Sequence, residues 1–196
     1  MKILILLFSF IFLSSCSLKT STKISPTPTM IPQTPIVSDN KTASESTTTP
    51  RSDTIVALDT INGQIVIKLY SKETPNTVAT FLKKVNSAFY DGLIFHRVIP
   101  GFMAQGGDPT GTGNGGGSQK SELNQIPFKR GSLGLARTPV TKEVSNDSQF
   151  YICFTTEGCG HLTGDYVNFG EVISGLDVLD KIVQGDKILK ISTTTK

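Results

Sequence analysis

Residues 95–108 read FHRVIPGFMAQGGD and place an arginine inside a mostly apolar stretch of chain. A Pro-Gly pair divides the stretch into two short extended segments, and the second of them carries Phe102, Met103 and Gln105. An arginine buried without a partner costs free energy. We therefore expect Arg97 to direct its guanidinium into a pocket bordered by the aromatic ring and the methionine. Side chains alternate along a strand, which puts Met103 and Gln105 on one face.

The residues on either side of this stretch have the short apolar periodicity of β-strands. Residues 55–58 and 64–69 are rich in β-branched side chains, and the Asn62-Gly63 pair between them is typical of a hairpin turn. Many short strands with few helices favour a closed antiparallel barrel. Further strands are expected at residues 93–99, 103–105, 132–136, 149–154 and 167–172.

Two helices are expected to cover the ends of this barrel. Thr74 and Pro75 are typical of a helix start, as a cap and as the first helical residue, and the apolar side chains within residues 78–85 share one helical face. A second amphipathic helix is expected over residues 176–183, and Gly185 would end it.

Residues 1–15 have the proportions of a secretion signal. Lys2 precedes an apolar run over residues 3–13, which is short for a membrane span, and residues 13–16 read LSSC. Small residues before a cysteine resemble the bacterial lipobox. That resemblance implies cleavage before Cys16 and acylation of its thiol and new amino group. The alternative is an ordinary signal peptide followed by an incidental cysteine.

Residues 16–52 predict a disordered tether that begins at the lipidated cysteine. Of the 36 residues from 17 to 52, 21 are Ser, Thr or Pro, and none is aromatic. Such a segment buries too little apolar surface to offset its chain entropy. A folded domain is therefore expected over residues 53–196. This layout predicts a lipid-anchored protein of the cell membrane that acts outside the cytoplasm, with inner and outer membrane both open.

Composition excludes several other classes of protein. The net charge is +3 and the sequence pI is about 8.7, with no block of like charges, so nucleic acid is not an expected partner. No His/Cys cluster has metal-ligand spacing, and we expect neither a metal nor a cofactor. Three cysteines are too few for a disulfide scaffold.

The order of these features resembles the cyclophilins. The hairpin, the first helix, residues 95–108, a Gly-rich loop at 111–117, residues 148–152 (SQFYI), residues 168–170 (NFG) and the final helix follow the family order over residues 54–183. With the strand pattern, the resemblance implies a mainly β fold, a closed eight-stranded antiparallel barrel capped by two α-helices. It also implies a peptidyl-prolyl cis/trans isomerase that acts on proline-containing unfolded or flexible polypeptides, and we expect a monomer.

The resemblance assigns roles to the matching positions. Arg97 corresponds to the catalytic arginine that contacts the proline amide. Gln105 corresponds to the glutamine that steadies this arginine and binds the substrate backbone. The implied substrate-binding residues are Phe102, Met103, Gly113, Ala136, Arg137, Gln149, Tyr151, His161, Leu162 and Tyr166.

Four of these positions depart from the usual family pattern. Arg137 stands in place of an asparagine, where we expect the backbone to make the substrate contacts. Tyr151 keeps the aromatic ring of the usual phenylalanine. His161 lies near the place of a tryptophan common in eukaryotic members, and Tyr166 replaces a pocket-edge histidine. The assignments of His161, Leu162 and Tyr166 depend on how the loop at residues 154–163 is aligned.

Two other functions stay open at this level. The same pocket would allow a binding module that holds proline loops without turnover. Cys153 and Cys159 would allow a thiol hydrolase, although Cys153 lies in an apolar strand, where a cysteine usually packs as a small hydrophobe. Outside the cytosol the two cysteines could instead pair as a disulfide.

Overall fold

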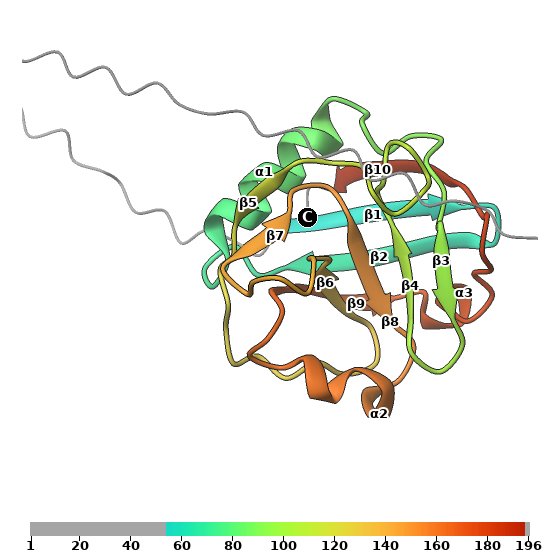
Figure 1. The fold of residues 1–196 in the computed structure, drawn as a ribbon. Helices are drawn as coiled ribbons and strands as arrows, with labels where there is room; N and C mark the ends of the chain where they lie inside the picture. The colour runs from blue at the N-terminus through green and yellow to red at the C-terminus, as the bar shows by residue number, and fades with distance from the viewer. Residues whose placement is uncertain (1–53, 195–196) are drawn as a thin grey trace, which may run out of the picture. The chain divides into compact units, whose positions relative to one another are not determined.

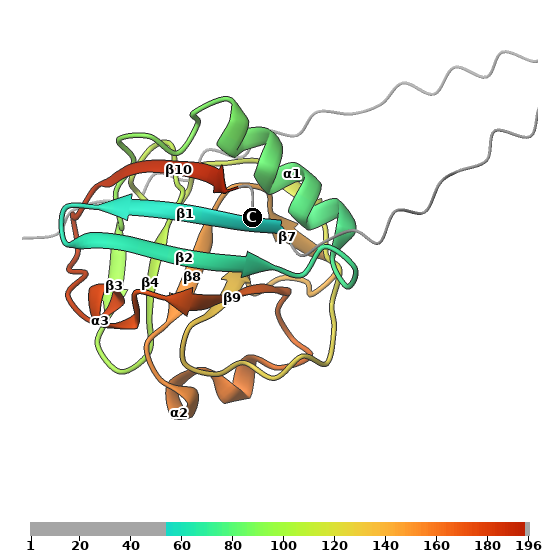
Figure 2. The same cartoon turned by 180° about the vertical axis from the view of Figure 1, so that it is seen from behind.

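The computed structural model describes residues 54–194 (Figures 1 and 2). The predicted signal peptide 1–15, the predicted lipidation site Cys16 and the predicted tether 16–52 lie outside the described residues. Within residues 54–194, no helix is long and apolar enough to cross a membrane. The elements in chain order are β1 (Thr54–Thr60), β2 (Gly63–Leu69), α1 (Pro75–Asn86), β3 (Arg97–Ile99), β4 (Met103–Gly106), β5 (Ser118–Lys120), β6 (Ser132–Leu135), β7 (Val144–Asn146), β8 (Phe150–Cys153), α2 (Thr156–Cys159), the 3-10 helix η1 (Gly160–Leu162), β9 (Asn168–Ser174), α3 (Leu176–Leu179) and β10 (Ile188–Thr194).

Eight strands form one antiparallel sheet in the order β10-β1-β2-β9-β6-β8-β4-β3, and β5 pairs with β7 separately. The large sheet curls into a half-barrel (Figure 1). The prediction of eight strands is confirmed, but the prediction of a closed barrel is wrong, because the edge strands β3 and β10 do not pair with each other. β3 has three residues before the Pro100-Gly101 turn, whereas β10 has seven. One isolated bridge, between Ile94 and Lys187, joins the segments next to these edges.

The hairpin of β1 and β2 forms as predicted, with a turn shifted by one residue. Thr60 pairs with Gly63, so the turn consists of Ile61 and Asn62. Gly63 has a φ of +128°, and a Cβ at this position would approach Val178 to 3.0 Å. Glycine therefore suits both the backbone conformation here and the packing of α3 against the hairpin.

The core lies inside the half-barrel, with α1 beside β1 and β10 (Figure 2). Val78, Phe81 and Val85 of α1 are buried, as their helical spacing predicts. The Phe81 ring contacts Phe150 and Phe169 edge-on, with ring centroids 5.9 and 5.4 Å apart. These contacts fasten α1 to the middle strands of the sheet.

The start of α1 is capped by a residue distant in sequence. Thr74 occupies the N-cap position and Pro75 begins the helix, as predicted, but the Thr74 side chain does not cap the helix, because its hydroxyl donates to the Tyr70 carbonyl at 2.9 Å instead. The Glu122 carboxylate accepts hydrogen bonds from the amides of Asn76 and Thr77, at 3.1 and 2.7 Å. An acidic group at a helix start satisfies free N–H groups and complements the helix dipole.

The helices near the C-terminus differ from the prediction. α3 ends at Leu179, and turns and irregular chain replace the expected continuation to residue 183, although Ile182 remains buried. α2 and η1 were not predicted, since each spans a single turn and offers no helical period. Of the two predicted capping helices, α1 alone has the expected length.

A second buried cluster lies apart from the main core. Cys153 and Cys159 within it form a disulfide whose Cα atoms are 6.2 Å apart. The disulfide alternative is therefore the one the structure contains. The cluster consists of Met103, Phe128, Tyr151, Cys153, Cys159 and Leu162, with Phe102 and Tyr166 packed against it.

Candidate active site

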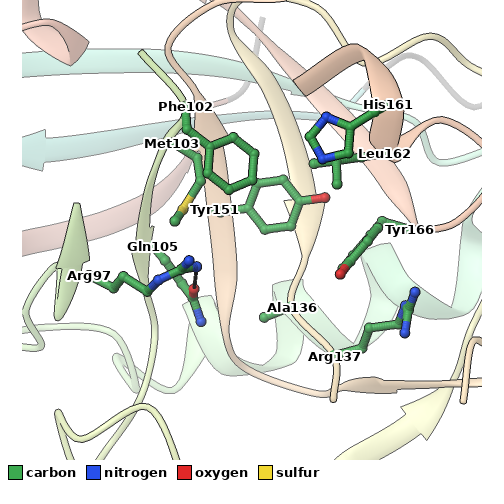
Figure 3. Close-up of a pocket in the computed structure, with 10 residues that line it drawn as sticks. All are labelled: Arg97, Phe102, Met103, Gln105, Ala136, Arg137, Tyr151, His161, Leu162 and Tyr166. Carbon is green, nitrogen blue, oxygen red and sulfur yellow. Dashed lines mark hydrogen bonds between the residues drawn. The ribbon is translucent and has the colours of Figure 1, made fainter. Parts of the chain in front are cut away.

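A pocket of about 210 Å³ opens beside the second cluster (Figure 3). All the residues that line it were predicted to belong to the site, and the structure brings them together from distant parts of the chain. They come from β3, the turn after it, β4, β8, η1, the chain after β6 and the loop before β9. The lining residues are Arg97, Phe102, Met103, Gln105, Ala136, Arg137, Tyr151, His161, Leu162 and Tyr166.

Three adjacent strands set the positions of the polar and apolar groups in the pocket. In the β3–β4 ladder Arg97 pairs with Gln105, and in the β4–β8 ladder Gln105 pairs with Tyr151 and Met103 with Cys153. Side chains opposite one another in a ladder share a face of the sheet. Arg97, Gln105 and Tyr151 therefore form one row across the sheet on the pocket side.

A chain of hydrogen bonds orients the Arg97 side chain. Its Nη1 donates to Gln105 Oε1 at 3.3 Å, and Gln105 Nε2 donates to Gln149 Oε1 at 2.8 Å. Gln149 Nε2 in turn donates to the carbonyls of Gly113 and Gly115, at 3.1 and 2.8 Å. Arg97 itself is exposed to solvent, so its charge keeps its hydration, and its guanidinium lies at the mouth of the pocket (Figure 3).

Apolar and aromatic side chains form one part of the pocket wall. Met103, Tyr151 and Leu162 are buried, whereas Phe102 is half-buried and His161 is exposed. The Phe102 and His161 rings stack with centroids 5.9 Å apart across the opening. A cation thus stands beside a partly aromatic hollow, an arrangement that suits a small apolar ring joined to a polar backbone.

Arg137 contributes more than its backbone. Its guanidinium lies over the Tyr166 ring, 4.3 Å from the centroid. Its Nε donates to the Asp165 carbonyl at 3.0 Å, and its Nη1 donates to the Thr138 carbonyl at 2.9 Å. The expectation that the backbone alone matters at this position is incomplete, because the side chain braces the loop that carries Tyr166.

Two predicted site residues lie outside the main pocket. Gly113 and Gln149 line a neighbouring hollow of about 160 Å³, which shares Gln105, Ala136 and Arg137 with the main pocket. The shared residues make the two hollows continuous along one surface. An extended peptide seated in the main pocket would therefore pass over Ala136 towards the second hollow.

One residue that was not predicted, Asp108, shapes the Gly-rich loop. Asp108 is 1% exposed, and its carboxylate accepts hydrogen bonds from the Thr110 amide at 2.8 Å and from the Gly113 amide. Burial of this carboxyl raises its pKa, but hydrogen bonds from Thr110, Gly115 and Gly113 outweigh that effect and lower the pKa to about 2. The sequence signal for this role is an aspartate shortly before a run of Gly and Thr residues, whose backbone amides a carboxylate can bind.

Other chemistry finds little support in the described part of the chain. Within residues 54–194, no group of three His, Cys, Asp or Glu side chains could hold a metal ion. Cys153 and Cys159 are bonded to each other, so neither offers a thiolate as a nucleophile. The thiol-hydrolase alternative therefore has no nucleophile here.

A family model described as cyclophilin type peptidyl-prolyl cis-trans isomerase/CLD matches residues 55–195. The chain belongs to the cyclophilin family. It is 41% identical over 142 residues to a peptidyl-prolyl cis-trans isomerase of Synechococcus elongatus, covering 70% of this chain and 94% of that protein. It is 39% identical over 132 residues to peptidyl-prolyl cis-trans isomerase B of Bacillus subtilis, covering 65% of this chain and 89% of that one. The predicted family and enzyme class are thus confirmed.

Solved cyclophilin structures share the fold. A cyclophilin of Cryptosporidium parvum is similar to this chain with a TM-score of 0.69 and 29% identity, covering 74% of this chain and 99% of that one. A second structure of the Cryptosporidium protein, in the presence of the dipeptide Ala-Pro, gives a TM-score of 0.67 at the same identity, covering 72% of this chain and 99% of that one. The fold of residues 54–194 is therefore a cyclophilin fold.

Proposed function

We propose that this cyclophilin accelerates the cis/trans isomerisation of X-Pro bonds in exported or cell-surface polypeptides, and that Arg97 stabilises the twisted amide. The observation that carries the proposal is the Arg97 guanidinium, held by Gln105 at the mouth of a pocket that Phe102, Met103 and Leu162 help to line. Family membership supports the reaction, and the arrangement of the pocket supports the role of each residue.

The reaction requires rotation about a partial double bond. Its barrier is ~18–20 kcal/mol because the amide must lose its conjugation. In the twisted state the proline nitrogen regains a lone pair, which a cationic donor stabilises more strongly than it stabilises the planar amide. This differential stabilisation is what lowers a barrier. No proton transfer, nucleophile or cofactor is needed in such a mechanism.

The other lining residues would bind the proline ring and the flanking backbone. Phe102, Met103 and Leu162 offer an apolar surface for the pyrrolidine ring, which buries its CH₂ groups there. Gln105 projects between Arg97 and Gln149, where its amide can hold the substrate backbone. The Ala-Pro dipeptide present with the Cryptosporidium cyclophilin supports a proline-containing ligand for this pocket.

An extracytoplasmic location is the second part of the proposal. The LSSC sequence at residues 13–16 supports lipidation at Cys16. The Cys153–Cys159 disulfide independently supports a location outside the cytoplasm, because disulfides persist in oxidising compartments. Labelling cells with radioactive palmitate tests lipidation at Cys16. We expect label on the full chain and none on the Cys16→Ser variant, and label on both would contradict lipidation at Cys16.

The catalytic role of Arg97 is tested on the full chain with a prolyl tetrapeptide anilide whose trans form alone is cleaved by chymotrypsin. We expect Arg97→Ala to lower kcat/KM by about 10²–10³-fold, the range for loss of one transition-state donor. Arg97→Lys should recover part of this loss, since it keeps a cation without the planar fork. Lys181→Ala serves as the control, because Lys181 is an exposed cation that pairs with Asp177 and lines neither hollow of the site.

Two results would contradict the proposal. Arg97→Ala at the full rate would exclude Arg97 as the catalytic group. A chain that binds the peptide by NMR, with no exchange between its cis and trans signals above the uncatalysed rate, would instead be a proline-binding module.

A further inference from the structure

The α2–η1 segment, residues 154–166, supplies one side of the pocket. His161, Leu162 and Tyr166 all come from it. It contains the four-residue α2, the three-residue η1 and no strand. Helices this short are not stable on their own. The position of the segment must therefore be set by its attachment to the rest of the fold.

Hydrogen bonds attach this segment near its two ends. The Thr155 hydroxyl donates to the Gly101 carbonyl at 2.7 Å. Near the other end, the Thr163 hydroxyl accepts from the Phe128 amide at 3.0 Å. Within η1 the backbone hydrogen bonds are internal, as in the donation from the Thr163 amide to the Gly160 carbonyl. The junction of α2 and η1, next to the pocket, is held by a covalent bond.

A disulfide attaches that junction to the strand beneath it. Cys159 ends α2 and is bonded to Cys153 of β8. Cys153 pairs with Met103 in the β4–β8 ladder and follows Tyr151 by two residues on the same face of the strand. The disulfide therefore runs from the row of residues that forms the pocket floor to a point two residues before His161.

The disulfide is the one covalent cross-link at this junction, and apolar packing of the second cluster surrounds it. Cys153 and Cys159 are both 0% exposed and share their cluster with Leu162, which is 6% exposed. This cluster of six residues is separate from the main core. Because both sulfurs are enclosed, a reductant reaches them only when the segment opens.

We propose that the Cys153–Cys159 disulfide is a positioning element of the active site, which holds Leu162 and His161 against the pocket floor and so sets the affinity for proline. The inference rests on the proposed isomerase function. The disulfide closes a short loop, which restricts the unfolded chain less than a long one. Arg97 and Gln105 lie on β3 and β4, outside the loop, so its loss should raise KM and leave kcat nearly unchanged.

The test compares oxidised and reduced forms of the full chain. The chain is unfolded with excess dithiothreitol and refolded in its presence. Each dithiol gives two electrons and two protons to the S–S bond, which becomes two thiols, while the reductant closes into a cyclic disulfide. The tryptic fragment 143–181 contains both cysteines and no internal Lys or Arg. Its mass therefore reports the oxidation state as a difference of two hydrogen atoms.

We expect KM for the prolyl tetrapeptide to rise about tenfold on reduction, the size expected when one side chain loses much of its apolar contact. Reoxidation should restore KM. The double variant Cys153→Ala/Cys159→Ala should behave like the reduced chain. Ile191→Val is the control, because Ile191 belongs to the main core and its substitution lowers the melting temperature without touching the second cluster.

Three results would overturn the inference. The first is a KM that does not change when the folded chain is reduced. The second is a rise of KM in Ile191→Val as large as the rise on reduction. The third is free thiols in fragment 143–181 of the native chain. An oxidised chain without isomerase activity would count against the proposed function. In that case the affinity of both forms for Ala-Pro, measured by NMR, still decides the positioning role, since equal affinities would refute it and a loss on reduction would support it.

Discussion

The Tyr151 ring lies directly over Gly134, its partner in the β6–β8 ladder. A Cβ at residue 134 would lie 2.3 Å from Tyr151 Cζ and 2.4 Å from the hydroxyl oxygen. The Tyr151 hydroxyl is buried and has no hydrogen-bond partner among residues 54–194. Glycine at position 134 thus provides the space that this tyrosine occupies in the pocket floor.

Gly134→Ala should disturb the pocket through this contact. The added methyl group forces the Tyr151 ring to move, and we expect the free energy of unfolding to fall by about 1–3 kcal/mol. We expect kcat/KM to fall at least several-fold, because Tyr151 lines the pocket. Gly160→Ala is the matched control, since no atom lies within 4 Å of a Cβ there. Equal effects of the two substitutions on kcat/KM would contradict the prediction.

Tyr151→Phe should stabilise the protein. A buried hydroxyl without a partner loses its hydration on folding, so its removal should raise the free energy of unfolding by about 1 kcal/mol. Burial also raises the pKa of Tyr151 well above its usual value, so the hydroxyl stays neutral and carries no charge that catalysis could use. Urea denaturation together with the isomerase assay checks both points. A less stable variant would mean that the hydroxyl has a partner.

Gln105 should act through Arg97. Gln105→Ala removes the acceptor that orients the guanidinium, and we expect kcat/KM to fall by about tenfold, as for a lost charge-assisted hydrogen bond. The double variant Arg97→Ala/Gln105→Ala should be little worse than Arg97→Ala, since groups that act as one unit are not additive. Additive losses in this double-mutant cycle would show that Gln105 contributes separately, by binding the substrate backbone.

Asp108 should make the stability of the domain depend on acidity. Burial raises its pKa, but the hydrogen bonds from Thr110, Gly115 and Gly113 lower the folded-state pKa to about 2, below the ordinary 3.8. As the pH falls, the unfolded state takes up this proton first, so the stabilisation is complete above pH 3.8 and is lost as the pH falls towards about 2.

Asp108→Asn tests this dependence. The variant should be less stable at neutral pH and should lack the part of the acid-induced loss that Asp108 causes. Thermal unfolding followed by circular dichroism between pH 7 and pH 2 measures the difference between the two proteins. A difference that does not change with pH would mean that the folded-state pKa of Asp108 is not lowered.

Local sequence patterns predicted much of the fold. Strand alternation, the Pro-Gly turn at Pro100 and the face of α1 around Phe81 each depend on residues close together in the chain. The length of α3 and the existence of α2 were not predictable, because one turn of helix has too few residues to show a period. The Glu122 cap of α1 joins residues 46 positions apart, beyond the reach of any local pattern.

The chemistry of the pocket was present in the order of residues. Arg97, Met103 and Gln105 lie in one short hairpin whose alternation places them on one face, and Phe102 lies in the turn between the two strands. Only the tertiary structure decided the surroundings of these four residues. The sheet stays open between β3 and β10, and Gln149 connects Gln105 to the Gly-rich loop. The tertiary structure also brought Cys159 next to Cys153. These relationships depend on contacts between segments far apart in the chain, and such contacts form only when the whole half-barrel packs.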